Sequence, residues 1–272
     1  SHVEKALKAG FDALWIGART TVNPFYVQEI ADALSGADVP LFVKNPVNPD
    51  LKLWLGGLER IERSISNTVY PLHRGFSLSG NSRFRNSPQW QLPIELHTMR
   101  PDITLVCDPS HIAGQKQYLF EIAQKALDLN YGGLMIETHF SPETALSDSK
   151  QQITPSELSH LLSRLLQREN IKPEGPVLEY LNRQRAVIDE CDVELLKLLS
   201  RRMSISQAIG ELKFEHQLSV LQPDRWKEIL ENALSSGLEL GLSNDFVDQL
   251  FKAIHDESID QQTFLRNREE AE

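Results

Sequence analysis

The stretch ITLVCDPSHIAG, residues 103–114, begins as a buried strand and ends in groups that enzymes use. Leu105 and Val106 belong to a short apolar run, and Asp108 and His111 follow it closely. A short apolar run bounded by turn residues is typical of a strand buried in a parallel sheet. Polar side chains directly after such a strand lie at the carboxyl end of the sheet, where α/β proteins bind ligands.

The same pattern occurs five times in the first 166 residues. Amphipathic stretches separate the apolar runs, which predicts parallel strands joined by crossover helices. Charged or polar residues end every run, which favours a (β/α)8 TIM barrel over a doubly wound sheet, because barrel sites collect residues from many strands. The expected strands are residues 12–19, 40–46, 68–77, 103–111 and 132–140, and the expected helices are residues 24–34, 50–64, 88–99, 115–129 and 155–167. Five strands are fewer than eight, so the sequence predicts a portion of an α/β barrel, about its strands 4–8.

A helical segment follows the barrel portion. Two prolines and a glycine interrupt the polar run 167–176, which we expect to link residues 1–166 to an all-α domain over residues 177–272. From Pro176 to Gly210 apolar residues recur at helical spacing, which predicts one helix roughly 50–60 Å long. Such a helix needs a partner, most simply a second copy of the chain. Two shorter helices are expected at residues 223–236 and 243–266.

Composition argues against several classes of function. The 272 residues are 40% hydrophobic and 24% charged, as in ordinary globular proteins, and no apolar run approaches the roughly 18 residues that span a membrane. The net charge of −10 argues against a nucleic-acid or anionic-membrane partner. Two cysteines and no basic-then-apolar leader favour a reducing cytoplasm over secretion.

Three candidate metal ligands follow the last two expected strands. His111, Glu137 and Asp148 combine an imidazole with two carboxylates, a donor set that suits Mn²⁺, Fe²⁺ or Zn²⁺. The alternative for a lone histidine at a strand end is an ordinary hydrogen-bonded residue, and it is the presence of all three that favours a metal.

Three cations follow the first three expected strands. These cations are Arg19, Lys44 and Arg74. At one barrel mouth they would repel one another unless an anion lay between them. The planar guanidinium of arginine matches phosphate and carboxylate groups. The alternative is that each side chain is solvated on the surface.

Six stretches of the first half resemble 3-deoxy-D-arabino-heptulosonate 7-phosphate (DAHP) synthases of the short microbial type. They are GARTT (17–21), VKNPVNPD (43–50), LHRGFS (72–77), CDPSHIAG (107–114), IETHF (136–140) and ALSDSKQQ (145–152). The resemblance implies an aldol-type condensation of phosphoenolpyruvate with erythrose 4-phosphate, in which the metal acts as a Lewis acid on the aldehyde. It implies that phosphoenolpyruvate binds Arg19, Lys44 and Arg74, that Lys44 is catalytic, and that the divalent metal binds His111, Glu137 and Asp148. Asp108 is then either a structural cap or a partner of the ligand His111.

The chain departs from that family in its first strands. A metal-binding cysteine and a Lys-Pro-Arg-Thr stretch are not found, and Cys107 lies on another strand and is not assumed to replace that ligand. We therefore expect a chain without its first barrel strands rather than a degenerate barrel, and we expect it to be a poor aldol synthase by itself.

A set of polar side chains recurs along the helical segment: Arg185, Arg202, Lys213, Arg225, Ser258 and Gln262. Arg185 and Arg202 share a helix face but lie about 25 Å apart, so one small ligand cannot touch both within one chain. A ligand can touch both if Arg185 comes from the partner of an intertwined dimer. The alternative is a helical dimerisation module with solvated charges.

Three stretches of this segment resemble an all-helical chorismate mutase. They are residues 181–213, 222–230 and 256–262. The resemblance implies that chorismate binds Arg185 of the neighbouring chain, Arg202, Lys213, Arg225, Ser258 and Gln262, with Lys213 and Gln262 catalytic at the ether oxygen. A pericyclic rearrangement to prephenate needs no nucleophile, so catalysis is orientation and preorganised electrostatics. Gln222 stands where an Asp is frequent, and Trp226 stands where a Glu usually follows the arginine.

Together the two resemblances predict a bifunctional enzyme of the shikimate pathway, cytoplasmic and dimeric through its helical domain. Three alternatives remain open: a related barrel synthase acting on another sugar phosphate, a mutase with a non-catalytic regulatory barrel, and a dimerisation module without activity. A chorismate assay separates the last of these from the others.

Overall fold

The chain folds into two compact units, Ser1–Ile171 and Lys172–Glu272. The structure is a computed structural model and describes residues 2–77, 83–167 and 173–269. The division falls inside the run 167–176 that the sequence assigns to a linker, of which residues 168–172 lie outside the described part. Within the described ranges, no helix has both the length and the apolar character that crossing a membrane requires.

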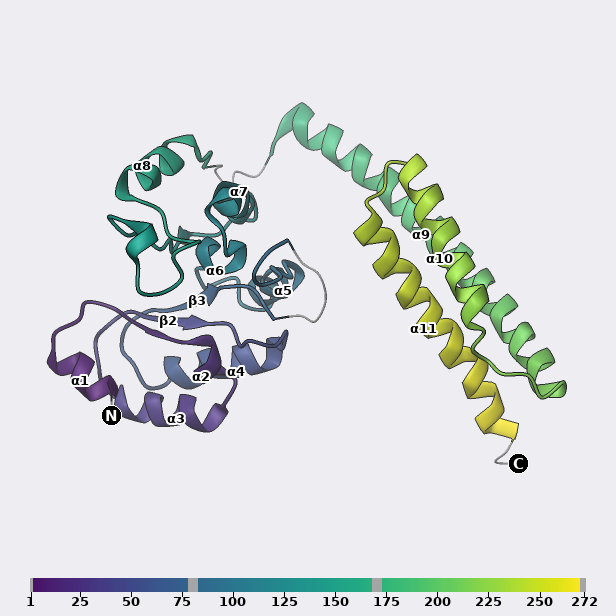
Figure 1. Ribbon diagram of the computed structural model, residues 1–272, viewed down its shortest axis with the longest axis horizontal. Helices are drawn as coiled ribbons and strands as arrows, with labels where there is room; N and C mark the ends of the chain where they lie inside the picture. Colours follow the sequence, from purple (N-terminus) through teal and green to yellow (C-terminus); the bar gives the residue numbers. More distant parts are fainter. Residues whose placement is uncertain (1, 78–82, 168–172, 270–272) are drawn as a thin grey trace. The chain divides into compact units, whose positions relative to one another are not determined.

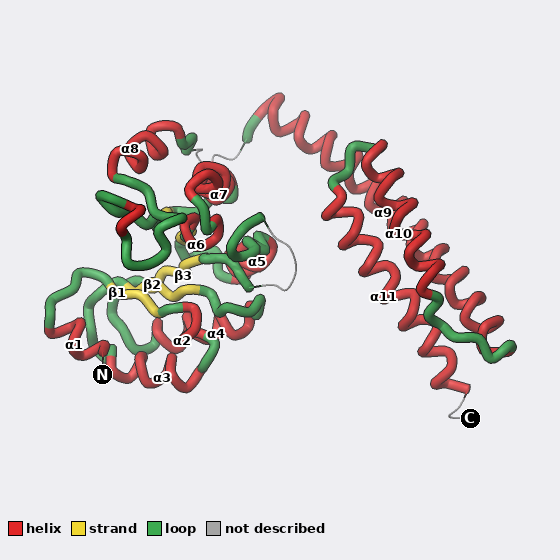
Figure 2. The backbone as a smooth tube through the Cα atoms, viewed as in Figure 1, coloured by secondary structure: helices red, strands yellow, loops and turns green. Residues whose placement is uncertain are grey.

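The first unit contains a five-stranded parallel sheet in which each strand pairs with the next one along the chain. Figure 2 shows β1, β2 and β3 side by side. The strands are β1 (Leu14–Ile16), β2 (Leu41–Lys44), β3 (Val69–His73), β4 (Val106–Cys107) and β5 (Gly133–Leu134). Each strand lies inside one of the five expected runs. Strands in chain order are the arrangement of a (β/α) barrel, so the prediction of a barrel portion is confirmed.

Helices precede, connect and follow these strands (Figure 1). They are α1 (His2–Lys8), α2 (Ala18–Thr21), α3 (Pro24–Ala33), α4 (Leu51–Glu62), α5 (Gln91–Met99), α6 (Pro109–Ala113), α7 (Leu119–Asp128) and α8 (Pro155–Arg164), with 3-10 turns η1 (Lys116–Tyr118) and η2 (Pro142–Thr144). Side chains in the sequence determine where several helices begin. Asn23, Asp50 and Thr154 accept hydrogen bonds from the first backbone N–H groups of α3, α4 and α8, which would otherwise lack partners.

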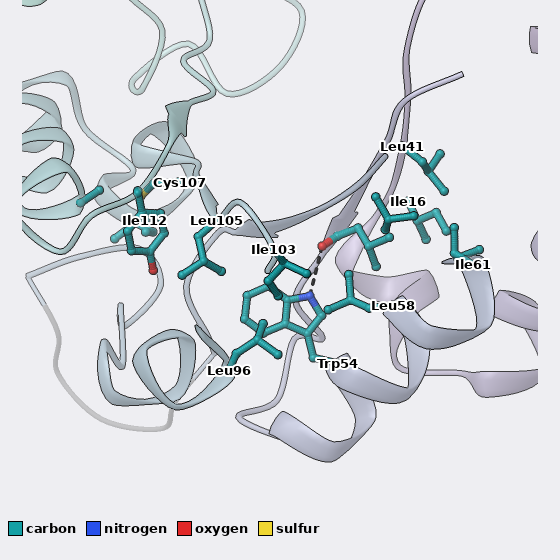
Figure 3. Packing of buried hydrophobic residues seen from close by; sticks show 14 of the residues in the cluster. Ile16, Leu41, Trp54, Leu58, Ile61, Leu96, Ile103, Leu105, Cys107 and Ile112 are labelled. Carbon is teal, nitrogen blue, oxygen red and sulfur yellow. Dashed lines mark hydrogen bonds between the residues drawn. The ribbon is translucent and has the colours of Figure 1, made fainter. Parts of the chain in front are cut away.

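Trp54 lies at the centre of the apolar core of the first unit. Its side chain is fully buried, and its Nε1–H donates a hydrogen bond of 3.1 Å to the carbonyl of Val43 on β2. Figure 3 shows the indole among Leu58, Leu96 and Ile103, so one residue of α4 connects the sheet to the segments that follow β3. The core thereby fixes the end of β2, where Lys44 follows Val43.

Three helices form the second unit, α9 (Gly175–Glu215), α10 (Pro223–Glu239) and α11 (Asn244–Glu269). The 41 residues of α9 make it about 60 Å long, as the sequence predicts. Gly175 and Pro176, which the sequence places in the linker, form its first turn, where the missing N–H of proline is tolerated. Helix α11 packs along both α9 and α10, and the prediction of an all-α domain is confirmed.

Candidate functional sites

The stretch after β4 forms a short helix, α6, that the sequence did not indicate. Asp108 caps it by accepting a hydrogen bond of 3.1 Å from the N–H of His111, Pro109 occupies its first turn, and Gly114 ends it with φ +69°. Five residues are too few for helical periodicity to be visible in a sequence. His111 therefore lies on α6 rather than directly at the strand end.

The structure brings the three predicted metal ligands together. One donor atom from each of His111, Glu137 and Asp148 lies within 4.8 Å of the other two. Nδ1 of His111 is 3.6 Å from Oε1 of Glu137. This nitrogen is buried and makes no hydrogen bond within the described residues, although Oδ2 of Asp108 is 2.8 Å away at an unfavourable angle. A buried imidazole nitrogen without a hydrogen bond beside two carboxylates fits a divalent cation.

Neighbouring side chains hold the two carboxylates of this cluster. Gln151 donates to Oε2 of Glu137 at 2.8 Å, and Ser110 Oγ accepts the backbone N–H of Glu137 at 3.0 Å. Arg85 donates 2.7 Å hydrogen bonds to Asp148 and to Oε1 of Gln151. Neither Arg85 nor Gln151 was expected at this site from the sequence. Gln151 lies in the ALSDSKQQ stretch and gave a weak signal, whereas Arg85 gave none.

Asp108 connects the cluster to the first set of cations. Its Oδ2 lies 3.0 Å from the Nζ of Lys44, and both side chains are buried. Burial alone would raise the pKa of Asp108, but the adjacent imidazole and backbone N–H of His111 and the charge of Lys44 lower that pKa below its ordinary value. Asp108 is therefore both the cap of α6 and a partner of His111, so the two roles that the sequence left open coexist.

Cys107 lies next to the cluster but outside the group of potential ligands. Its side chain is fully buried, and burial together with the charge of Asp108 raises the pKa of its thiol well above the ordinary value. Metal binding requires the thiolate, so this environment disfavours Cys107 as a ligand.

Arg74 directly follows β3 and is positioned by two asparagines that were not expected from the sequence. Its Nη1 donates to Oδ1 of Asn86 at 2.8 Å, and its backbone N–H donates to Oδ1 of Asn45 at 2.7 Å. Gly75 follows with φ +76°, and a Cβ there would lie 2.9 Å from the Cβ of Asn86, so a side chain at this position would push Asn86 away.

Arg74 also lies in the field of other cations. Burial lowers the pKa of its guanidinium, Asp108 acts in the opposite direction, and the positive charges of Arg85 and Arg19 lower the pKa further. Arg19 lies on α2 and is exposed. Mutual repulsion among these cations is relieved when an anion binds between them, which agrees with an anionic substrate at this end of the sheet.

The second unit encloses a pocket of about 450 Å³ between α9, α10 and α11. Five of the six predicted chorismate-binding residues line it: Arg202, Lys213, Arg225, Ser258 and Gln262. Isoleucines and the aromatic pair Trp226 and His255 complete much of the wall. A pocket with apolar walls and a few convergent polar groups is typical of a small-molecule site.

Hydrogen bonds orient the polar groups of this pocket. Arg202 donates to the hydroxyl of Ser258 at 2.5 Å. Lys213 donates to Oε1 of Gln262 at 3.4 Å, and Gln262 donates to the hydroxyl of Ser206 at 2.8 Å. Burial lowers the pKa values of Arg202 and of Lys213. These desolvated cations interact more strongly with an anionic ligand than they would in water.

Arg225 and Arg185 differ from this central group. Arg225 is exposed and forms a 2.6 Å ion pair with Glu228 one turn further along α10, an interaction that is weak at a surface. Arg185 is exposed on α9 and does not line the pocket. Seventeen residues separate it from Arg202, or about 25 Å along the helix.

The first unit is thus an α/β barrel portion with a His–Glu–Asp cluster near a group of cations, and the second is an all-helical unit with a cationic pocket. Residues 3–172, more than half of the chain, match the model of the DAHP synthetase I family, and the chain belongs to that family. Residues 184–263 match the model of chorismate mutase type II. The resemblance of both halves to these families is confirmed.

Individual relatives agree with this division. The phospho-2-dehydro-3-deoxyheptonate aldolase of Thermotoga maritima is 24% identical over 145 residues, which are 52% of this chain and 40% of that protein. The bifunctional chorismate mutase/prephenate dehydratase of Aquifex aeolicus is 36% identical over 63 residues, which are 23% of this chain and 17% of that protein. The chain thus spans less than half the length of either curated relative.

A solved structure supports the fold. A truncated form of the 3-deoxy-D-arabino-heptulosonate 7-phosphate synthase from Thermotoga maritima superposes with a TM-score of 0.51 at 22% identity, over 58% of this chain and 58% of that chain. At this identity the likeness supports the architecture of the first unit and says nothing of its substrates.

Proposed function

We propose that the second unit catalyses the rearrangement of chorismate to prephenate, and that the first unit carries the phosphoenolpyruvate and metal sites of a DAHP synthase. The observation that carries the mutase proposal is the convergence of five predicted binding residues on one pocket. The family matches of the two units support their assignment to successive parts of one pathway.

The cations of the pocket wall support this proposal. Chorismate has two carboxylates, and Arg202 and Arg225 provide guanidinium groups at two places along the wall. Lys213 and Gln262 lie within hydrogen-bond reach of each other, so both can donate to the ether oxygen as it gains negative charge. The Ser258 hydroxyl holds the Arg202 guanidinium in place.

We infer that the active form is a homodimer. Helix α9 keeps large apolar side chains half or more exposed, as expected of a helix whose partner lies on another chain. They include Val187, Ile188, Leu196, Leu198 and Leu212. An antiparallel second copy would also bring its Arg185 to the open end of the pocket.

The mutase proposal is tested by following chorismate consumption. Lys213→Met should lower the rate by about 10²–10³-fold, because it removes a donor aimed at developing charge. Lys197→Met on the same helix is the matched control, since Lys197 lies outside this pocket and should retain near-wild-type activity. A wild-type chain that does not convert chorismate, or a Lys213→Met variant that equals the control, would refute the proposal.

In the first unit, we propose that Arg19, Lys44 and Arg74 hold phosphoenolpyruvate and that Lys44 also contacts the reacting groups. Lys44 is kept in place by its ion pair with Asp108, and Arg74 by its hydrogen bond to Asn86. A divalent ion, of which Mn²⁺, Fe²⁺ and Zn²⁺ suit the donor set, would supply Lewis acidity toward the aldehyde of erythrose 4-phosphate.

The metal site is tested by titrating the chain with Mn²⁺ alone and measuring binding calorimetrically. His111→Ala should abolish binding, whereas Cys107→Ala should leave it nearly unchanged. Loss of binding in the Cys107 variant would overturn the ligand assignment. We further propose that the protein works in the cytoplasm, which is supported by two cysteines that form no disulfide, and that the chain by itself is a poor aldol synthase.

A further inference from the structure

Two aromatic rings face each other in the wall of the mutase pocket. Trp226 on α10 and His255 on α11 stack with ring centroids 4.0 Å apart and planes inclined by only 11°. Both residues line the pocket beside Arg202 and Lys213. Stacking on the larger indole fixes the plane of the imidazole, so the ring nitrogens of His255 have a restricted set of directions.

The imidazole of His255 has hydrogen-bonding capacity that the protein leaves unused. The side chain is half-buried, and among the described residues its one close partner is the indole of Trp226, with no hydrogen bond to its nitrogens. Burial lowers the pKa of His255, Asp256 on its own helix acts in the opposite direction, and Arg202 and Lys213 on α9 lower it further. A neutral imidazole offers one donor and one acceptor at neutral pH.

The charge pattern of the pocket indicates what such a group would recognise. The described lining contains the three cations Arg202, Lys213 and Arg225 but no carboxylate. In the proposed mutase reaction these cations would pair with the two carboxylates and the ether oxygen of chorismate, which would leave the ring hydroxyl without a charged partner. Ser258 accepts a hydrogen bond from Arg202, and Gln262, which accepts one from Lys213, is assigned with that lysine to the ether oxygen.

We propose that His255, held flat by Trp226, hydrogen-bonds the ring hydroxyl of the substrate and makes the pocket selective for hydroxylated dicarboxylates. This inference rests on the proposed mutase function and identifies a residue for the neutral part of its substrate. Gln222, which also lines the pocket, is exposed at the start of α10 and is not held by a ring contact. It is therefore the weaker of the two neutral candidates.

The test compares chorismate with the analogue in which hydrogen replaces the ring hydroxyl. His255→Phe keeps an aromatic ring for the stack but removes both nitrogens. The His255→Phe variant should have a kcat/KM for chorismate roughly tenfold below that of the wild type, as expected for one lost hydrogen bond in a partly buried site. Its kcat/KM for the analogue should stay within about twofold of the wild type. His255→Asn restores a donor and an acceptor without the stack and should recover part of the selectivity. Gln222→Ala should retain the wild-type preference.

Each outcome separates the two proposals. If the wild type converts neither compound, the mutase function fails and the role of His255 fails with it. If the wild type is active and His255→Phe loses activity equally toward both compounds, His255 only shapes the wall and the hydroxyl contact is refuted. If Gln222→Ala rather than His255→Phe removes the preference, the contact belongs to Gln222. Circular dichroism of each variant verifies that the helical unit remains folded.

Discussion

Replacing Asp108 with asparagine should destabilise the first unit by about 3–5 kcal/mol, because it leaves a buried ammonium without its counter-ion. The Lys44 side chain lies 3.0 Å from Asp108, and the two residues are only 9% and 1% exposed. A surface ion pair would contribute about 1 kcal/mol or less. Burial is therefore what makes the expected effect large, relative to a typical domain stability of about 5–15 kcal/mol.

The structure allows the charge effect to be separated from the capping effect. Asparagine caps helices about as well as aspartate, so Asp108→Asn keeps the hydrogen bond from the N–H of His111. Lys44→Met removes the ammonium instead and leaves Asp108 with its partners on α6. The double variant Asp108→Asn/Lys44→Met contains neither charge, so it should be clearly more stable than Asp108→Asn alone.

The assay is urea unfolding followed by tryptophan fluorescence. Trp226 is the only one of the four tryptophans outside the first unit, so a Trp226→Phe background restricts the signal to that unit. The free energies of unfolding of the two single variants and the double variant complete a thermodynamic cycle. A loss below about 1 kcal/mol for Asp108→Asn, or a double variant as unstable as that single one, would refute the reasoning.

Three further predictions concern pH, packing and assembly. Burial lowers the pKa of His73 to about 4, whereas a histidine in an unfolded chain has a pKa near 6.5. As the pH falls, the unfolded chain therefore binds a proton before the folded one does. The free energy of unfolding should consequently fall by about 3 kcal/mol between pH 7 and pH 4. His73→Phe should abolish that part of the pH dependence, and an unchanged profile in urea titrations would contradict the assignment. A Cβ at Gly210 would lie 2.8 Å from Cγ of Gln262. Gly210→Ala should therefore displace the Gln262 amide and reduce mutase turnover at least tenfold. If the Gly210→Ala variant turns over chorismate like the wild type, the two helices can move apart without cost. If each site of the dimer contains residues from both chains, mixing inactive Arg185→Ala and Arg202→Ala chains should restore up to about a quarter of wild-type activity. If no activity returns although mass measurements verify subunit exchange, Arg185 acts in a site of its own chain.

The regular elements were predictable because their patterns extend over enough residues to be seen. Each strand lies inside an apolar run with polar ends, and α9 has helical periodicity over many turns. The short helices α2 and α6 were missed because one turn of helix contains no repeat. The barrel portion was therefore predicted from the sequence, but the exact environment of His111 on α6 was not.

The sequence predicted the charged residues of the candidate sites but not the residues that hold those charged side chains in place. Local motifs marked the ligands and the cations, whereas the supporting contacts join residues far apart in sequence. Lys44 and Asp108 are 64 residues apart, and Arg85 and Asp148 are 63 apart. No local sequence motif marks Asn86. It reaches Arg74 only because Gly75, which has no side chain, lets the segment that follows β3 approach the segment around Asn86 closely. A pairwise contact of this kind leaves no periodic trace in a single sequence.

The order of the sheet has a consequence for handling the protein. In the described part of the chain β1 pairs only with β2 and β5 only with β4, so among these residues the other side of each strand is an edge of the sheet. A closed barrel has no such edges, and open ones recruit strands from other molecules. Edge strand β1 also carries Trp15, whose side chain is 64% exposed, so an apolar group lies beside the unpaired backbone. Residues 1–272 prepared by themselves should therefore self-associate through β1 at high concentration, and a lysine in place of Trp15 should reduce that association without altering either site.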